Sequence, residues 1–405
     1  MKNIGFEMAR ACVEERAHLM PKQVIPIEES SGFVLAEDIA SSVDIPPSAV
    51  SAMDGYAIFH GDTSEASKES PARLPISGSS VAGADTILVL PPHTAGRITT
   101  GAMIPKNADA VVEEEVVQER DDSTVEIPIV VQSGRNIRRL GADISRNQSL
   151  ALQGQLLTPR LVGHLAAGGL NEVPVIGKPK IHVIGVGDEL VAPGDEIGTA
   201  QTYASNLAFI RTWLNQKGIP CFGEIIGDNS IKLRDSMEAA LDSSDVLITC
   251  GGAWGSSRDL VLPVLEKMGL SLVFQRLLMA PGKGMAFGTI RDKPIFCLPG
   301  GPPACEMAFL QLVLPAIYKY AGRTEPVFPH IPARLTEDAT CKKKDWTVFK
   351  GGTLAEDDTG FTVTPITNVG RMEAMALSNC IIKIPEGTVR LDKDSMTRIQ
   401  VLSWA

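Results

Sequence analysis

Three glycine-rich segments stand directly after short apolar runs, and they are the parts of the sequence best suited to hold a ligand. They are GVGDEL at 185–190, GGAWGSSRD at 251–259 and LPGGPP at 298–303. Glycine lets the backbone come close to a bound group, and the N–H groups at the start of a following helix attract anions. One such segment is more simply explained as a tight turn, but three together predict a site for a phosphorylated ligand. None has the pattern of a P-loop or of a dinucleotide-binding loop.

Carboxylates accompany these loops. Asp188 and Glu189 lie in the first loop, Asp259 ends the second, and Asp228 follows the extended segment PCFGEIIG. Because carboxylates repel phosphate, we expect a bridging Mg²⁺, which binds one or two carboxylates together with phosphate oxygens. The alternative for Asp188 is a local capping role. Lys283 in PGKG is either a contact for an oxyanion or a solvated turn lysine.

The N-terminal half holds two further candidates. Asp54 lies in SAMDGYA, where Asp-Gly is by itself a turn signal. Asp143 ends GRNIRRLGADI, which also contains three arginines, Arg135, Arg138 and Arg139. These arginines form either a solvated basic turn or a site where guanidinium groups capture an anion.

Strands and helices alternate between residues 180 and 320, which predicts parallel strands with helices on both faces. The glycine loops then meet at one edge of the sheet, where ligands bind in such folds. Short strands at 70–131 predict a β-rich unit, and those at 325–405 predict a second one. Apolar spacing predicts helices over 3–19 and within 134–170. Residues 304–317 are apolar on almost every side, so we expect cover from more than one direction and hence a homodimer.

Composition narrows the class of protein. The chain has 405 residues, enough for two to four domains, and no apolar run approaches the ~20 residues of a membrane-spanning helix. Asp and Glu number 48 against 38 Lys and Arg, a net charge of −10 that argues against nucleic-acid binding. The seven scattered cysteines indicate reduced thiols in a cytoplasmic protein, and the six histidines show no zinc spacing.

Several longer motifs occur in an order that resembles the MoeA family of molybdopterin molybdenumtransferases, which is related to the C-terminal half of gephyrin. The similarity covers about residues 3–400, and its motifs are PPSAVSAMDGYAI, RITTGAMIPKNADAVVEEE, GRNIRRLGADI, VGDEL, the GG loop, MAPGKGMAFG and LPGGPPA. The resemblance implies a multidomain α/β plus β fold in a homodimer. Its four domains are a linker domain (1–44 and 143–176), an inserted β-rich domain (45–142), a doubly wound α/β molybdopterin-binding domain (177–322) and a C-terminal β-barrel-like domain (323–405).

The resemblance also implies an activity: molybdate or tungstate is inserted into adenylylated molybdopterin, and AMP is released with the help of Mg²⁺. A molybdopterin adenylyltransferase is then a possible partner. Matching the motifs position by position assigns catalytic roles to Asp54, Asp143, Glu189, Asp228, Asp259 and Lys283. The metal ligands are Asp188, Glu189 and Asp259. The ligand-binding positions are Thr100, Gly101, Gly187, Asp188, Gly251, Gly252, Ser256, Pro281, Gly282, Pro299 and Gly300. Asp54 is expected to act on the α/β domain of the other subunit.

Four motifs depart from the family pattern. Val186 replaces a threonine, Trp254 a serine, Ala280 a lysine and Ala304 a serine, and Gly301 and Gly284 also replace an Asn and a Pro. The two loops at 280–284 and 298–304 form the oxyanion corner of the family, so we expect weaker oxyanion binding here. The alternative is a non-catalytic or altered-specificity relative that binds molybdopterin or a related nucleotide as a carrier or scaffold. A third possibility is that the α/β domain has the same fold but catalyses adenylyl transfer or nucleotide hydrolysis.

Overall fold

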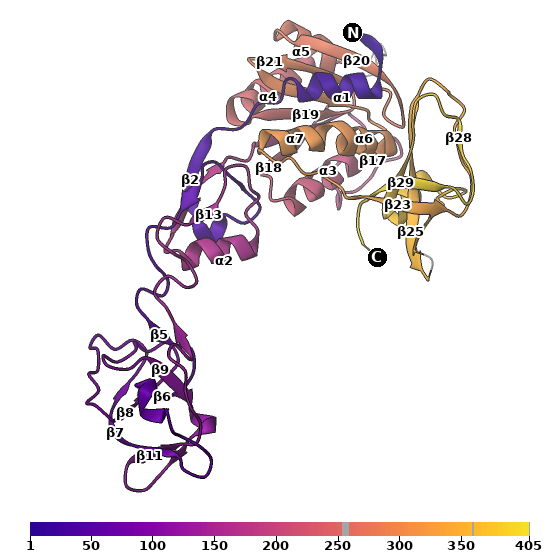
Figure 1. Ribbon diagram of the computed structural model, residues 1–405. Coiled ribbons are helices and arrows are strands. Elements are labelled where there is room, and N and C mark those ends of the chain that lie inside the picture. Colours follow the sequence, from indigo (N-terminus) through magenta and orange to yellow (C-terminus); the bar gives the residue numbers. More distant parts are fainter. Residues whose placement is uncertain (253–258, 359, 405) are drawn as a thin grey trace. The chain divides into compact units, whose positions relative to one another are not determined.

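A computed structural model describes residues 1–252, 259–358 and 360–404 (Figure 1). The chain divides into two compact units. The α/β unit comprises residues 1–23, 32–34 and 175–405, and the β-rich unit comprises 24–31 and 35–174. None of the described helices is long and apolar enough to cross a membrane.

The β-rich unit is built around a six-stranded sheet in the order β10-β11-β7-β8-β6-β9. Both faces of this sheet are buried: Tyr56, Ile58, Val112 and Val125 belong to a core on one face, and the intervening Ala57 and Val111 belong to a second cluster on the other. The strands are β6 (Gly55–Ile58), β7 (Ala72–Ser80), β8 (Ala95–Ile98), β9 (Ala110–Glu113), β10 (Gln118–Glu119) and β11 (Thr124–Ile127). The predicted strands at 70–131 are therefore confirmed.

Residues 134–158 contain no helix, so the prediction of helix across 134–170 is wrong except at its end. Only α2 (Pro159–Ala167) forms there; it begins at Thr158, whose hydroxyl accepts the N–H of Leu161 at 3.3 Å, and has proline in its first turn. The remaining residues pair with distant strands, a contact that local spacing does not reveal. The pairs are β5 (Val50–Ser51) with β12 (Ile137–Arg138) and β4 (Ile39–Ala40) with β13 (Ser149–Ala151). A further sheet has the order β2 (Lys22–Pro26), β14 (Glu172–Ile176), β3 (Val34–Leu35).

The α/β unit contains the predicted parallel strands, and their register brings the three glycine loops to one edge. The order is β18-β15-β19-β22, followed by the antiparallel strands β21 and β20. Gly185 lies opposite Cys250, and Cys250 opposite Leu298, so all three strands end at the same level. The strands are β15 (Ile181–Val186), β18 (Cys221–Ile226), β19 (Val246–Cys250), β20 (Ser271–Ala280), β21 (Ala286–Ile290) and β22 (Lys293–Leu298).

Helices cover both faces of this sheet, as predicted. One face packs against α1, α3 and the helix that follows β22, and the other packs against α4 and α5. Pro263 is tolerated in α5 because it lies in the first turn, where no intrahelical N–H is needed. The helices are α1 (Phe6–Glu14), α3 (Ser205–Gln216), α4 (Ser230–Ser243) and α5 (Val261–Lys267).

The N-terminal helix is shorter than predicted. Residues Lys2–Gly5 form strand β1, which runs parallel to β20 with Ile4 opposite Leu277, and α1 begins only at Phe6. The buried side chains Phe6, Ala9 and Val13 have the helical spacing on which the prediction rested. The preceding residues adopt an extended conformation because a distant strand offers them backbone partners.

The apolar segment after β22 is covered by its own chain. It comprises α6 (Pro302–Ala308), a π-helical turn (Phe309–Val313) and α7 (Leu314–Tyr320). Pro315 has no N–H to donate to the carbonyl of Gln311, which accounts for the widened turn just before it. Phe309, Leu312 and Val313 are at most 1% exposed. This helix therefore no longer argues for a second subunit.

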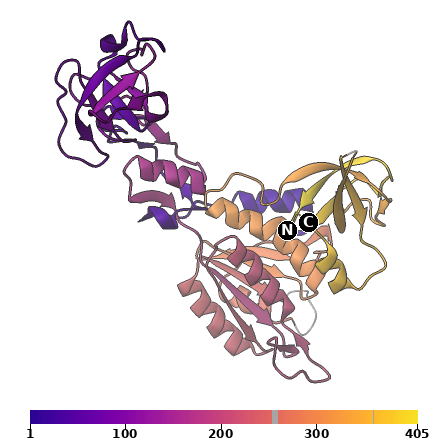
Figure 2. The same cartoon turned by 90° about the horizontal axis from the view of Figure 1, so that it is seen from below.

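The C-terminal strands close into a five-stranded barrel in the order β25-β26-β23-β29-β27, with β27 pairing back to β25 (Figure 2, yellow). The barrel is joined to the α/β sheet through β25, whose Val348 pairs with Ala280 of β20. The elements are β23 (His330–Leu335), β25 (Thr347–Asp357), β26 (Gly360–Pro365), α8 (Arg371–Leu377), β27 (Cys380–Ile384) and β29 (Met396–Val401). Two short pairs are β16 (Leu190–Val191) with β17 (Thr202–Tyr203) and β24 (Ala339–Thr340) with β28 (Arg390–Leu391). The predicted combination of α/β and β architecture is confirmed.

Candidate active site at the carboxyl ends of the parallel strands

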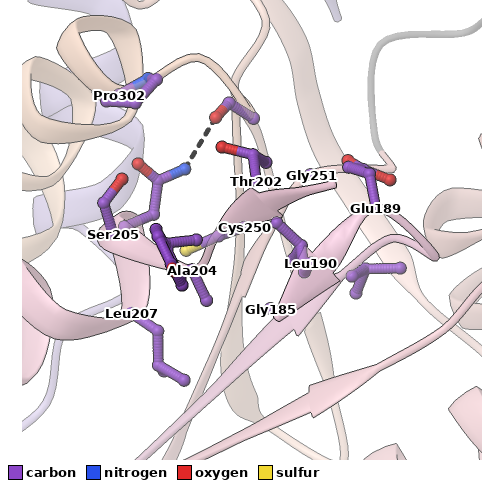
Figure 3. Close-up of a pocket in the computed structure, with 14 residues that line it drawn as sticks. Gly185, Glu189, Leu190, Thr202, Ala204, Ser205, Leu207, Cys250, Gly251 and Pro302 are labelled. Carbon is purple, nitrogen blue, oxygen red and sulfur yellow. Dashed lines mark hydrogen bonds between the residues drawn. The ribbon is translucent and has the colours of Figure 1, made fainter. Parts of the chain in front are cut away.

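A cavity of about 130 Å³ lies where the glycine loops meet the start of α3 (Figure 3). Its walls come from the ends of β15 and β19, from the loop after β22 and from the segment between β17 and α3. Figure 3 shows Glu189 on one flank of this cavity and Ser205 and Pro302 on the other. The predicted ligand positions Gly251 and Gly300 line it directly. We call it the strand-edge cavity.

The glycines let the loops approach one another closely. Gly251 has φ +96°, and a Cβ at this position would lie 2.6 Å from the carbonyl oxygen of Val186. Gly252, at φ +65°, would place a Cβ 2.8 Å from Val261. A Cβ on Gly300 would in turn lie 3.6 Å from the Cα of Gly251. Both the backbone conformation and the space at Gly251 therefore require glycine.

Replacing Gly251 by Ala is expected to lower the free energy of unfolding by about 2 kcal/mol, because the new methyl group meets a backbone carbonyl at a strained φ. Urea denaturation measures this difference. Gly301→Ala is the matched control, since Gly301 has an ordinary φ of −70° and a Cβ there meets nothing within 4 Å. Equal stabilities of the two variants would contradict a close contact between Gly251 and the carbonyl oxygen of Val186.

The four predicted carboxylates of this unit have different surroundings. Asp188 accepts the backbone N–H of Asp228 at 2.8 Å and so ties the loop after β15 to the loop after β18, a structural contact different from the local cap considered for it. The Glu189 side chain lines the strand-edge cavity and has no hydrogen-bond or ion-pair partner among the described residues, while its backbone carbonyl accepts the N–H of Thr202 at 2.7 Å. Asp228 is exposed, and Asp259 is half-buried. Of these four carboxylates, Glu189 is the one that lines the cavity, where a cation can reach it.

The three predicted metal ligands do not form a preassembled cage. Within residues 1–252, 259–358 and 360–404, no three or more His, Cys, Asp or Glu side chains are grouped to hold a metal ion. Mg²⁺ normally takes one or two protein carboxylates and completes its shell with phosphate oxygens and water. The surroundings of Glu189 fit that mode of binding. Ser256 and Trp254 lie outside the described residues.

The two loops of the predicted oxyanion corner lie together. Gly282, at φ +121°, would place a Cβ 3.6 Å from the carbonyl oxygen of Ala304. Pro281 and Pro303 line a common cavity of about 180 Å³, which we call the corner cavity. Lys283 lies in the turn between β20 and β21, with its ammonium 5.6 Å from the centre of the Trp346 ring. Pro299 is buried directly after β22.

In the β-rich unit, the motif residues Asp54 and Thr100 are in contact. The Asp54 carboxylate accepts both the backbone N–H and the hydroxyl of Thr100, at 2.7 and 3.1 Å. Gly101, at φ +81°, follows in the same turn and donates its N–H to the carbonyl of Ser51. Asp54 and Thr100 are both exposed. Two motifs that lie 46 residues apart thus form one polar surface site.

The arginines near Asp143 bind carboxylates of their own chain. Arg138 pairs with Asp143, and Arg135 holds Glu113 at 3.0 Å. The Arg135 hydrogen bond contributes to lowering the pKa of Glu113, against the opposing effect of burial. Arg135 and Arg138 thus bind anions, as one of the two alternatives stated, but these anions are carboxylates of the same chain. Arg139 has no ion-pair partner among the described residues.

Sequence reasoning missed the polar residues at the start of α3. Asn206 donates its side-chain N–H to the carbonyl of Gly300 at 2.7 Å, while its Oδ1 atom is buried without a partner among the described residues. Thr202 and Ser205 also line the strand-edge cavity. A possible signal was the pair Ser-Asn at the head of a helix that follows an extended segment. A buried acceptor without a donor costs free energy, so its position beside the cavity suits a ligand N–H group.

Comparisons with known proteins agree with this architecture. Residues 4–169 match the MoeA N-terminal region (domain I and II), and residues 182–319 match a probable molybdopterin binding domain. The molybdopterin molybdenumtransferase 2 of Mycobacterium tuberculosis is 31% identical over 84% of this chain and 83% of its own length. The molybdopterin molybdenumtransferase of Haemophilus influenzae is 33% identical over 78% and 77%.

Solved structures give the same result. A molybdopterin biosynthesis MoeA protein from Pyrococcus horikosii superposes with a TM-score of 0.83 at 30% identity, over 100% of both chains. The agreement thus extends over both units of the chain as well as over the sequence motifs. This chain belongs to the MoeA family of molybdopterin molybdenumtransferases.

Proposed function

We propose that this chain inserts molybdenum or tungsten, supplied as the oxyanion, into adenylylated molybdopterin and releases AMP. The observation that carries the proposal is the strand-edge cavity, where the glycine loops meet the Glu189 carboxylate and the Asn206 Oδ1 atom, neither of which has a partner in the described part of the chain. The names of the relatives, molybdopterin molybdenumtransferases, support the same substrate class. The metal is bound by the dithiolene sulfurs of the pterin, so the protein needs no thiolate or imidazole ligands of its own.

Each part of the cavity has a role in this proposal. The backbone N–H groups near Gly251 and Gly300 hold the pterin phosphate, because glycine lets the chain approach it. The Oδ1 atom of Asn206 accepts an N–H of the pterin ring and so gains the partner that it lacks. Glu189 would hold Mg²⁺, which when bound neutralises phosphate charge as AMP leaves.

A second candidate function is a carrier or scaffold for the pterin. It is favoured by the apolar residues in the oxyanion corner, where Ala280 and Ala304 stand in place of polar side chains. In that case the strand-edge cavity binds adenylylated molybdopterin without turnover.

The decisive experiment incubates the purified chain with adenylylated molybdopterin, Mg²⁺ and either molybdate or tungstate, and follows AMP by chromatography. We expect AMP only when both the oxyanion and Mg²⁺ are present. Binding of adenylylated molybdopterin without AMP release under any of these conditions would favour the carrier function. No binding of the pterin would contradict both functions.

A homodimer in which Asp54 completes the site of the other subunit is part of the proposal. Sedimentation is expected to give twice the 43.2 kDa chain mass. If Asp54 acts across the dimer, a mixture of inactive Asp54→Asn and Glu189→Gln chains should regain about a quarter of the wild-type activity, since half of the dimers are mixed and each has one intact site. A monomer at micromolar concentration, or no regain after subunit exchange, would contradict this arrangement.

We also propose a cytoplasmic enzyme supplied by a molybdopterin adenylyltransferase. All seven cysteines are free, and four of them are buried, which suits a reducing compartment. The adenylylated substrate must come from an adenylyl-transfer reaction, and direct transfer between the two proteins would protect it from hydrolysis.

A further inference from the structure

The corner cavity contains a carboxylate that neither the sequence motifs nor the family resemblance singled out. Its walls are formed by the turn after β20, by α6 and α8, and by the barrel. Most of its lining is apolar, including Phe349, Ile381 and Leu402, and Glu306 on α6 contributes a carboxylate. An ionised carboxylate in such surroundings loses water molecules that solvate its charge, and the apolar side chains around it cannot take their place.

Glu306 and Arg371 line this cavity without being paired to each other or to any other described residue. Burial raises the pKa of Glu306 to about 7, so its carboxyl group exchanges its proton near neutral pH. Arg371, the first residue of α8, is exposed and keeps its positive charge. The cavity therefore presents one fixed cation and one group that is either neutral or negative.

No other ionisable group among the described residues faces Glu306 from within the cavity. Strands β25 and β27 contribute Phe349, Gly351 and Ile381, and the chain after β29 contributes Leu402. The Ser378 hydroxyl of α8 donates to the carbonyl of Ala374 at 2.6 Å. Beside Glu306 on α6, the thiol of Cys305 stays neutral, because burial, with contributions from Cys250 and Glu306, raises its pKa well above the usual range. Lys283, in the turn that contains Pro281, contacts Trp346.

The family resemblance already implies that the loops at 280–284 and 298–304 hold the oxyanion of the reaction. We propose that in this chain the tetrahedral oxyanion enters the corner cavity together with one proton, which is carried by Glu306. This inference rests on the proposed function. Molybdate and tungstate are dianions at neutral pH, and an ionised Glu306 would repel them at short range. The neutral carboxyl group instead donates an O–H hydrogen bond to an oxyanion oxygen, while Arg371 supplies the positive charge. The proton is taken from solvent on binding and returned on release, so the O–H bond of the Glu306 carboxyl group is the only covalent bond that forms and breaks.

The test is calorimetric titration of the whole chain with molybdate at several pH values. With the proton obligatory and a pKa of about 7 for Glu306, wild-type affinity is expected to fall about tenfold from pH ~6 to pH ~8. Glu306→Gln keeps a neutral hydrogen-bond donor, so its affinity should change by less than about twofold over this range. Glu373→Gln is the matched control, because Glu373 is an exposed carboxylate on α8 outside the cavity lining, and it should behave as wild type.

A second measurement needs no variant. Wild-type titrations at pH ~8, repeated in buffers of different ionisation enthalpy, should show uptake of close to one proton per oxyanion. Folding of the Gln variant can be checked through its melting temperature. The folded state holds the Glu306 proton more tightly than the unfolded state, so ionisation destabilises wild type as pH rises from the usual carboxyl pKa to about 7. The Gln variant should therefore melt higher than wild type at pH ~8 and equally at pH ~4.

The outcomes separate this inference from the function on which it rests. AMP release together with wild-type oxyanion binding that takes up no proton would overturn the role of Glu306 and leave the proposed function intact. The same follows if Glu306→Gln shows the wild-type dependence on pH. Absence of oxyanion binding and of AMP release at every pH would overturn both. An affinity for molybdate that rises with pH would also overturn the proposal.

Discussion

Replacing Glu189 by Gln should reduce Mg²⁺-dependent AMP release by about a hundredfold or more, because the variant loses the negative charge that holds the cation beside the phosphate. The Glu189 side chain lines the strand-edge cavity without a partner among the described residues, so its replacement breaks no hydrogen bond or ion pair to any of them. The fold and the melting temperature should therefore be unchanged. Asp259→Asn should have a comparable effect on AMP release if Asp259 holds the same cation. Initial rates at saturating oxyanion, measured over a range of Mg²⁺ concentrations, check both variants.

The dependence of AMP release on Mg²⁺ concentration shows why each variant loses activity. A missing cation ligand should be partly compensated by raising the Mg²⁺ concentration, whereas a missing contact to the pterin should not. Glu196→Gln serves as the control, since Glu196 is an exposed carboxylate in the following loop and does not line the cavity. Unchanged turnover in Glu189→Gln would remove Glu189 from the mechanism, and unchanged turnover in Asp259→Asn would do the same for Asp259.

The meeting of the glycine loops at one sheet edge could be predicted from the sequence because its signal is local. Each glycine loop follows an apolar strand, and parallel strands must bring their carboxyl ends to one edge, so Gly251 and Gly300 meet without any knowledge of tertiary contacts. The pairing of Asp54 with Thr100 could not be derived in the same way, since it depends on the fold of the β-rich unit. Only the family motifs connected these two residues beforehand.

The parts that escaped prediction depend on distant partners. Ile4 is extended because β20 lies beside it, although its spacing suits a helix equally well. Arg138 is neutralised by Asp143, a pairing that turns an expected anion site into an internal contact. The half-buried Glu306 shares its cavity with Phe349 of the barrel and with Leu402 just after β29, which lie 43 and 96 positions further along the chain. No window of sequence around Glu306 contains that information.

Because this chain departs from the family pattern in the oxyanion corner, restoring the family residues there should increase its affinity for molybdate. Ala280→Lys combined with Ala304→Ser should tighten molybdate binding by about tenfold or more, since one charge-assisted and one hydroxyl contact contribute about 1 kcal/mol each. Ala280 ends β20 just before Pro281, and Ala304 lies in the first turn of α6, so both flank residues of the corner cavity. The increase in affinity is measured by calorimetric titration at pH ~6. At this pH Glu306 is mostly protonated, so its negative charge does not oppose molybdate binding.

A control separates charge from bulk in this test. Ala280→Met adds a side chain of similar length without an ammonium group, so with Ala304→Ser it should recover only the hydroxyl contact, a few-fold in affinity. If the corner cavity no longer serves an oxyanion, titrations with molybdate and tungstate will stay flat for the wild type and for both double variants. The strand-edge cavity would then still bind the adenylylated pterin, because its glycine loops and Asn206 are independent of the corner residues. That combination would identify a carrier or scaffold, whereas tighter binding in the lysine variant alone would establish the corner cavity as the entry point of the metal.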